Sequence, residues 1–176
     1  PDMRLKTFSA WERTVLIPVE LVAAFKWALL VVPFFFLMDS FLGPGQFWVM
    51  ARSQGIYSVL AILMAVLAGA VLTPLLLPWI PGRAFSLKGL VLGVVTTLLF
   101  FALRWGSGGG WPVRLEMAAW LLLLPSISAY LAMNFTGSST YTSLSGVKKE
   151  MRFAVPLQIG GGTVGLLLWI GSHFIS

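Results

Sequence analysis

Five long apolar stretches constrain this chain more than any other feature of its sequence. They cover residues 17–38, 56–79, 87–105, 115–133 and 153–174. A bilayer core about 30 Å thick is crossed by roughly 20 residues of α-helix. None of the stretches alternates polar and apolar residues, as the strand of a transmembrane barrel would. Because backbone groups in lipid must bond within their own segment, we expect an all-α, polytopic transmembrane bundle of five helices.

Composition supports a membrane protein and narrows its chemistry. Hydrophobic residues make up 58% of the 176 residues, charged residues 10%, and mean hydropathy is +0.90. Soluble domains carry about 25% charged residues. The chain has no Cys, six acidic residues and one His, which excludes disulfides and thiolate metal sites. We therefore expect no catalytic residue and no metal site in this chain, and a stand-alone intramembrane enzyme is disfavoured.

Lys and Arg predict the orientation in the membrane. Most lie before the first stretch or in the second and fourth connections: Arg4, Lys6, Arg13, Arg83, Lys88, Lys148, Lys149 and Arg152. Fewer lie on the other side, namely Arg52, Arg104 and Arg114. The positive-inside rule then places the N-terminus in the cytoplasm and the C-terminus outside the inner membrane. Because the basic residues are divided among short loops, we expect contact with membrane lipid and none with nucleic acid.

Residues 1–16 precede the transmembrane domain, which we assign to residues 17–176. Ser9 and Glu12 match a capping box, which predicts a helix that begins near Ala10 and runs into the first span. The segment is amphipathic, so we interpret it as an interfacial helix, as a linker from a missing upstream domain, or as both. The start at Pro1, without Met, suggests a fragment or a processed chain.

Glu20 and Lys26 are ionisable residues inside the first apolar stretch. Such residues cost about 2.5–3.5 kcal/mol each at mid-bilayer. They predict a polar intramembrane site, and with it the alternative function of a small transporter or channel. Snorkelling of Lys26 or a structural hydrogen bond would explain them equally well. Asp39 and His173 lie at outer helix ends, where we expect Asp39 to be solvated and His173 to lie outside the bundle.

Small residues and tryptophans predict packing and interfaces. Ala61, Ala65, Gly69 and Thr73 form a stripe that favours close helix approach. The glycines Gly160, Gly162 and Gly165 match a dinucleotide fingerprint, but no strand precedes them, so we expect a thin or partly unwound helix near another backbone. Indole rings near helix ends favour the membrane interface, which applies to Trp48, Trp79, Trp105, Trp111 and Trp169.

The connection between the fourth and fifth stretches is the richest polar segment. Seven of the ten residues 136–145 are Ser or Thr: Thr136, Ser138, Ser139, Thr140, Thr142, Ser143 and Ser145. Asn134, Phe135 and Tyr141 add an amide and two aromatic rings, and Lys148, Lys149 and Arg152 follow. Hydroxyls at this density can form hydrogen bonds to the backbone within turns or to a partner. We therefore predict these thirteen residues as a contact surface for a partner, although an ordinary polar loop is the alternative.

The run from Asn134 to Met151, followed by Pro156-Leu157-Gln158, resembles the membrane region of the mercury-methylation corrinoid proteins, the HgcA family. The segment from Glu12-Arg13 to Pro18-Val19-Glu20 is also similar, and five helices fit the architecture of that family. The resemblance implies the C-terminal membrane domain of a corrinoid-dependent methyltransferase that converts Hg(II) to methylmercury. It also implies an upstream corrinoid-binding domain with a cap-helix Cys and a ferredoxin-like iron–sulfur partner. This chain lacks that domain, so it would bind no corrinoid itself and would anchor and orient the missing domain.

Overall fold

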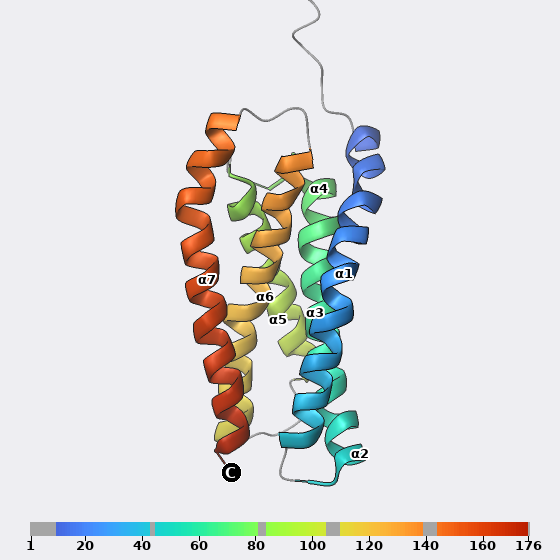
Figure 1. The fold of residues 1–176 in the computed structure, drawn as a ribbon, viewed down its shortest axis with the longest axis vertical. Coiled ribbons are helices and arrows are strands. Elements are labelled where there is room, and N and C mark those ends of the chain that lie inside the picture. The colour runs from blue at the N-terminus through green and yellow to red at the C-terminus, as the bar shows by residue number, and fades with distance from the viewer. Residues whose placement is uncertain (1–9, 43–44, 81–83, 105–109, 139–143, 176) are drawn as a thin grey trace, which may run out of the picture.

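The computed structural model describes residues 10–42, 45–80, 84–104, 110–138 and 144–175. The first, third, fourth and fifth spans are single helices: α1 (Ala10–Leu42), α5 (Phe85–Arg104), α6 (Trp111–Ser138) and α7 (Leu144–Phe174). The second span is a continuous run of α-helical and π-helical (η) segments: α2 (Phe47–Met50), η2 (Ala51–Gly55), α3 (Ile56–Val66), η3 (Leu67–Leu72) and α4 (Thr73–Leu76). Figure 1 shows these spans side by side in one elongated bundle.

The predicted all-α bundle is confirmed for the described part of the chain, which contains five helices long and apolar enough to cross a membrane. The helices extend beyond the predicted apolar stretches, because helical hydrogen bonding continues into the polar flanks. Thus α7 begins at Leu144 rather than at residue 153. Helix α1 begins at Ala10, as the capping pair predicts. Residues 10–16 are continuous with α1, whereas residues 1–9 lie outside the described residues, so a separate interfacial helix stays a prediction.

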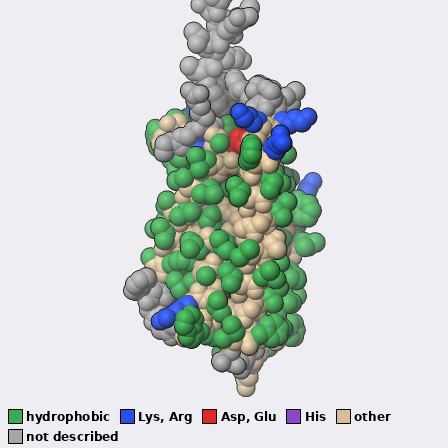
Figure 2. Space-filling view, turned by 90° about the vertical axis from the view of Figure 1, so that its left-hand side faces the viewer, with side chains coloured by type: hydrophobic (Ala, Val, Ile, Leu, Met, Phe, Trp, Pro, Cys, Tyr) green, Lys and Arg blue, Asp and Glu red, His purple; other side chains and the backbone are tan. Residues whose placement is uncertain are grey.

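The bundle has two chemically different ends. The basic end holds the starts of α1, α5 and α7 and the ends of α4 and α6, and it is uppermost in Figure 1. The other end, called here the C-terminal end, holds the ends of α1, α5 and α7 and the start of α6. Lys and Arg side chains gather at the basic end on the face that Figure 2 shows, above a largely hydrophobic flank. The flank is the surface expected to face lipid.

Large aromatic side chains fill the half of the bundle nearest the C-terminal end. Phe35 of α1 lies with its ring centroid 4.5 Å from that of Trp169 of α7 and 5.5 Å from that of Trp120 of α6. Trp169 is fully buried, so its predicted interfacial position is wrong. Its place on α7 faces α1 and α6 rather than lipid. In contrast, Trp48, Trp79 and Trp111 are exposed near helix ends, as expected.

Small residues pack the other half, around Ser128 of α6. A Cβ added to Gly69 would lie 2.7 Å from the Ser128 carbonyl oxygen, and one added to Gly89 would also lie 2.7 Å from it. One added to Gly93 would lie 3.0 Å from the Ser128 Cβ. The Ser128 hydroxyl donates a hydrogen bond to the Gly89 carbonyl oxygen (2.7 Å). Without a hydrophobic force between helices in lipid, such close contacts and interhelical bonds hold helices together. The predicted small-residue stripe is confirmed.

Helix α7 is continuous through its glycines, so the predicted unwinding is wrong. Gly165 approaches α6 closely, since an added Cβ would lie 2.8 Å from Leu123 Cγ and 3.1 Å from the Ala119 carbonyl oxygen. Gly160 and Gly162 have no atom within 4 Å of such a Cβ. Only part of the glycine cluster therefore serves packing. Towards the basic end, α7 leaves open grooves beside α6.

Candidate functional site

The basic end carries charged residues of two kinds, some exposed and some hydrogen-bonded to neighbouring helix ends. Lys148, Lys149 and Arg152 are exposed on the first turns of α7. The Ser86 backbone N–H donates to Oε1 of Glu150 (2.6 Å), so α7 supplies an acceptor to the start of α5. The Lys88 ammonium donates to the Leu77 carbonyl oxygen (2.5 Å) and so satisfies a carbonyl at the end of α4. These two bonds fix neighbouring helix ends relative to one another while the cations of α7 stay exposed.

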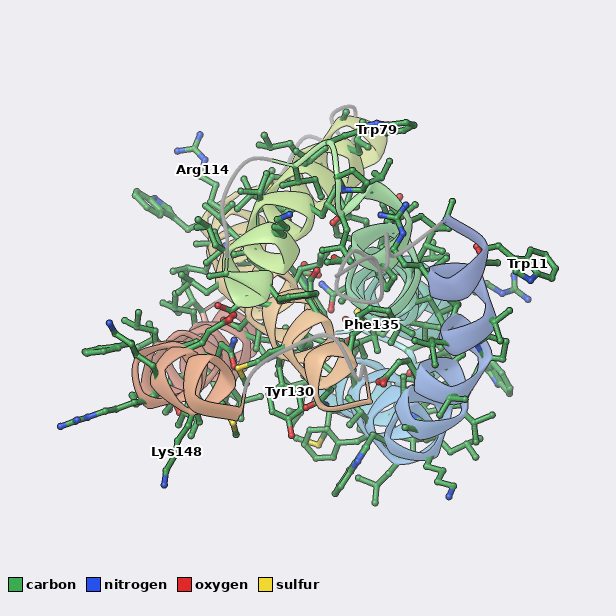
Figure 3. The ribbon with its side chains drawn as sticks, turned by 90° about the horizontal axis from the view of Figure 1, so that it is seen from above. Trp11, Trp79, Arg114, Tyr130, Phe135 and Lys148 are labelled. Atoms are coloured by element: carbon green, nitrogen blue, oxygen red, sulfur yellow. The ribbon has the colours of Figure 1, made fainter. Side chains whose placement is uncertain are left out.

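The predicted partner-contact residues divide into described and undescribed positions. Asn134 is exposed in the last turns of α6, whereas Phe135 is only 1% exposed and lies inside the bundle (Figure 3). Phe135 therefore offers no exposed ring to a partner. Thr136 and Ser138 end α6, and Ser145 belongs to the first turn of α7. Ser139, Thr140, Tyr141, Thr142 and Ser143 lie outside the described residues.

Two segments distant in the sequence meet at this end. The start of α1, which contains Arg13, and the ends of α6 and α7 that flank residues 139–143 all lie at the basic end (Figure 1). Arg13 itself is only 8% exposed. The start of α1 therefore lies at the same end of the bundle as the end of α6 and the start of α7.

Glu20 and Lys26 do not form a shared site. Glu20 is 8% exposed and faces the interior of the bundle, whereas Lys26 lies on the exposed side of α1. Six residues on a helix of 3.6 residues per turn place the two side chains about 120° apart around the helix axis. The position of Lys26 is that of a side chain that can extend its ammonium along the helix towards the interface.

Sequence reasoning missed a buried ionisable pair at the C-terminal end. Nε2 of His173 in α7 lies 2.8 Å from Oδ1 of Asp39 in α1. Asp39 is fully buried, so the expectation that it is solvated is wrong. The His173 side chain is 4% exposed, so the expectation that it lies outside the bundle is also wrong. Both residues face inward because α1 and α7 converge at this end around Trp169, whose ring lies 4.8 Å from that of His173.

The geometry of the pair fixes the number of protons that the two side chains share. Nδ1 of His173 lies 2.8 Å from the Trp169 carbonyl oxygen, which can only accept, so Nδ1 must carry a hydrogen. Nε2 faces a carboxyl oxygen of Asp39. A hydrogen bond there requires either an imidazolium facing a carboxylate or a neutral imidazole facing a carboxylic acid. In both forms the pair holds one proton more than neutral His with ionised Asp. It therefore links α1 to α7 by a charge-assisted or strong neutral bond.

A sequence signal for this pair did exist. An odd number of spans puts the ends of the first and last helices at the same side of the membrane, so Asp39 and His173 had to share a surface. Their mutual contact depends on helix rotation, which the apolar stretches do not encode. Glu116, on the second turn of α6, adds another buried carboxyl near that surface.

The site has no metal-binding character in the part of the chain that the structure describes, where no group of three or more His, Asp or Glu residues could hold an ion. Comparison with known protein families, with curated proteins and with solved structures finds no match to the chain. The two ends of the bundle must therefore be interpreted from their own chemistry.

Proposed function

We propose that this bundle is the membrane domain of a corrinoid-dependent methyltransferase acting on Hg(II), and that it anchors and orients a cytoplasmic corrinoid domain at its basic end. The observation that supports this proposal best is the convergence of two segments. The start of α1, where an upstream domain would join, lies at the same end as the last turn of α6 and the first turn of α7, which flank the polar connection in the sequence. Both segments carry the sequence resemblance to the mercury-methylation family.

The exposed groups at this end suit a docking role. Lys148, Lys149 and Arg152 give a cationic surface beside an amide, Asn134, and beside the Ser/Thr-rich connection. Cations of this kind steer an acidic partner, such as a ferredoxin-like protein, towards the surface and set its orientation. They contribute little to folding because they are exposed.

The residues of this chain do not fit a corrinoid site of their own. A lower ligand to cobalt would need a free imidazole or thiolate. His173 is the only His, and both of its ring nitrogens already have hydrogen-bond partners inside the bundle. The chain has no Cys. The proposal therefore assigns corrinoid binding and methyl transfer to the upstream domain and assigns positioning to the bundle.

Replacing residues 136–145 with a Gly/Ser linker of equal length in the full polypeptide tests the proposal. We expect normal membrane insertion but loss of methylmercury formation and of partner binding. Normal insertion, binding and methylation together would refute it. Determining the coding sequence upstream of Pro1 is an independent check, since the proposal requires a corrinoid domain with a cap-helix Cys there.

Neutralising the cations at one end of the bundle and then at the other tests the docking surface itself. Changing Lys148, Lys149 and Arg152 to Gln should weaken binding of the acidic partner about tenfold or more at low salt, with less effect at high salt. The matched control changes Arg52 and Arg114 to Gln at the other end and should leave binding unchanged. Equal losses in both variants would contradict a docking surface at the basic end.

The transport alternative rests on Glu20, because Glu20 is buried in the bundle whereas Lys26 lies on the exposed side of α1. It predicts flux of Hg(II)–thiol complexes or protons into liposomes that Glu20→Gln abolishes. An absence of flux in the unmodified chain would remove this alternative.

A further inference from the structure

A groove opens beside α7 near the middle of the bundle. Its volume is about 510 Å³. Its walls come from α1 and α7, which diverge here, and α3 and α6 form its floor. In the view along the bundle, Tyr130 of α6 lies between α7 and α1 (Figure 3). The lining is almost entirely apolar, with Ala24, Ala28 and Val31 on the α1 side.

One polar side chain in this groove has no partner. Both amide atoms of Gln158 are buried, and neither has a hydrogen-bond partner in the described structure. Gln158 lines the groove together with Ser126, and the same two residues line the neighbouring groove on the α5 side of α7. A buried amide without a partner is unfavourable, so a ligand that supplies an acceptor or a donor would be favoured here.

Cations continue the groove towards the membrane surface. Lys148, Arg152, Val155, Ile159 and Gly162 follow one another at spacings of four, three, four and three residues, so they share one face of α7. The last three line the groove, and the first two are exposed cations above it. Lys149 lies about 100° around the helix from Lys148, away from this face.

We propose that the groove binds a membrane phospholipid with an anionic head group. Its phosphate lies at Lys148 and Arg152, and an acyl chain lies along Val155, Ile159 and Gly162. Gln158 lies about 9 Å deeper than Arg152 along the helix, at six residues and 1.5 Å per residue. The Gln158 amide can donate to an ester carbonyl oxygen of a lipid whose glycerol enters the groove. Gly162 has no atom within 4 Å of an added Cβ, which leaves room for the chain.

Three features select this occupant. The groove opens on the flank of a bundle whose helices can cross a membrane, so bilayer lipid is the molecule in contact with it. Its apolar lining fits an acyl chain. The cations above it complement an anionic head group, since Lys and Arg near the membrane surface attract anionic lipids.

Native mass spectrometry of the detergent-solubilised chain with added phosphatidylglycerol or phosphatidylcholine tests the proposal. We expect one tightly retained phosphatidylglycerol per chain and a preference over phosphatidylcholine. The double change Lys148→Gln and Arg152→Gln should reduce that preference about thirtyfold. Lys149→Gln is the matched control and should have a smaller effect. Equal retention of the two lipids by the unmodified chain would overturn the proposal. So would a loss of preference in Lys149→Gln as large as that in the double variant.

Two further variants separate the groove from the general surface. Gly162→Leu fills the groove and should release the lipid, whereas Gly160→Leu, two residues away and equally free of neighbours, should not. Gln158→Leu should remove any preference for ester-linked over ether-linked phosphatidylglycerol. Retention of lipid by Gly162→Leu with a normal circular dichroism spectrum would contradict the site. Because the readout is lipid binding by this chain, the result is independent of methylation.

Discussion

The two halves of the bundle use polar groups in opposite ways. In the C-terminal half, Asp39 and His173 are buried and face each other among the aromatic rings of Phe35, Trp120 and Trp169. In the basic half, Lys148 and Arg152 are exposed, and α7 diverges from α1 above a groove that opens near the middle of the bundle. The closed half holds the helices together, and the open half presents groups to other molecules. Changes in the closed half should therefore alter stability, and changes to the exposed cations should alter binding.

The largest expected effect on stability comes from Asp39→Ala. Removing one partner of a buried pair leaves the other uncompensated and typically costs about 3–5 kcal/mol. We expect a marked fall in the thermal unfolding midpoint of the detergent-solubilised chain. The double variant Asp39→Leu with His173→Leu should recover much of the loss, because it removes both polar groups. A loss for Asp39→Ala no larger than that of a surface variant would break the comparison between the halves.

The next effect comes from the glycine contacts around Ser128. In Gly89→Ala, the new Cβ would collide with Ala132 Cβ and lie 2.9 Å from Ala129 Cα, so the two helices must separate. Overpacking of this kind costs about 1–3 kcal/mol. Gly160→Ala is the control, because it meets no neighbour, and it should stabilise α7 by about 0.5–1 kcal/mol. The two unfolding midpoints should therefore shift in opposite directions.

Ser128→Ala should have a moderate effect. It removes the bond from the Ser128 hydroxyl to the Gly89 carbonyl oxygen without adding volume. Interhelical hydrogen bonds in membrane proteins average about 0.6 kcal/mol and reach about 1.7 kcal/mol. Chemical unfolding in mixed micelles measures the change. A loss as large as that of Asp39→Ala would show that the small-residue half contributes equally to stability.

The smallest stability effect belongs to the exposed cations. Changing Lys148, Lys149 and Arg152 to Gln should alter the free energy of unfolding by less than about 0.5 kcal/mol, as for most surface substitutions. The same variant should reduce retention of anionic lipid. An unchanged free energy of unfolding with reduced lipid retention would show that these residues serve binding and not folding. A strongly destabilised variant would instead place them among the structural residues.

The sequence predicted the architecture because long apolar stretches leave few alternatives in a bilayer. Helix number, the start of α1 at Ala10 and the close packing of the small-residue stripe all follow from local residue patterns. Contacts between distant helices were not predictable in the same way. Asp39 and His173 were interpreted as terminal residues, and Phe135 as an exposed ring, because nothing local encodes the rotation of a helix about its axis. The groove at Gln158 likewise depends on the divergence of α1 and α7.

Labelling of single cysteines at Ser139 and Ser107 tests most directly whether the two ends lie on opposite sides of a membrane, and the naturally Cys-free chain allows it. In sealed vesicles of known orientation, we predict that an impermeant maleimide reaches the cysteine at Ser139 only from the cytoplasmic side. It should reach the cysteine at Ser107 only from the other side. Labelling of both positions from the same side would contradict the five-span bundle and its division into two ends.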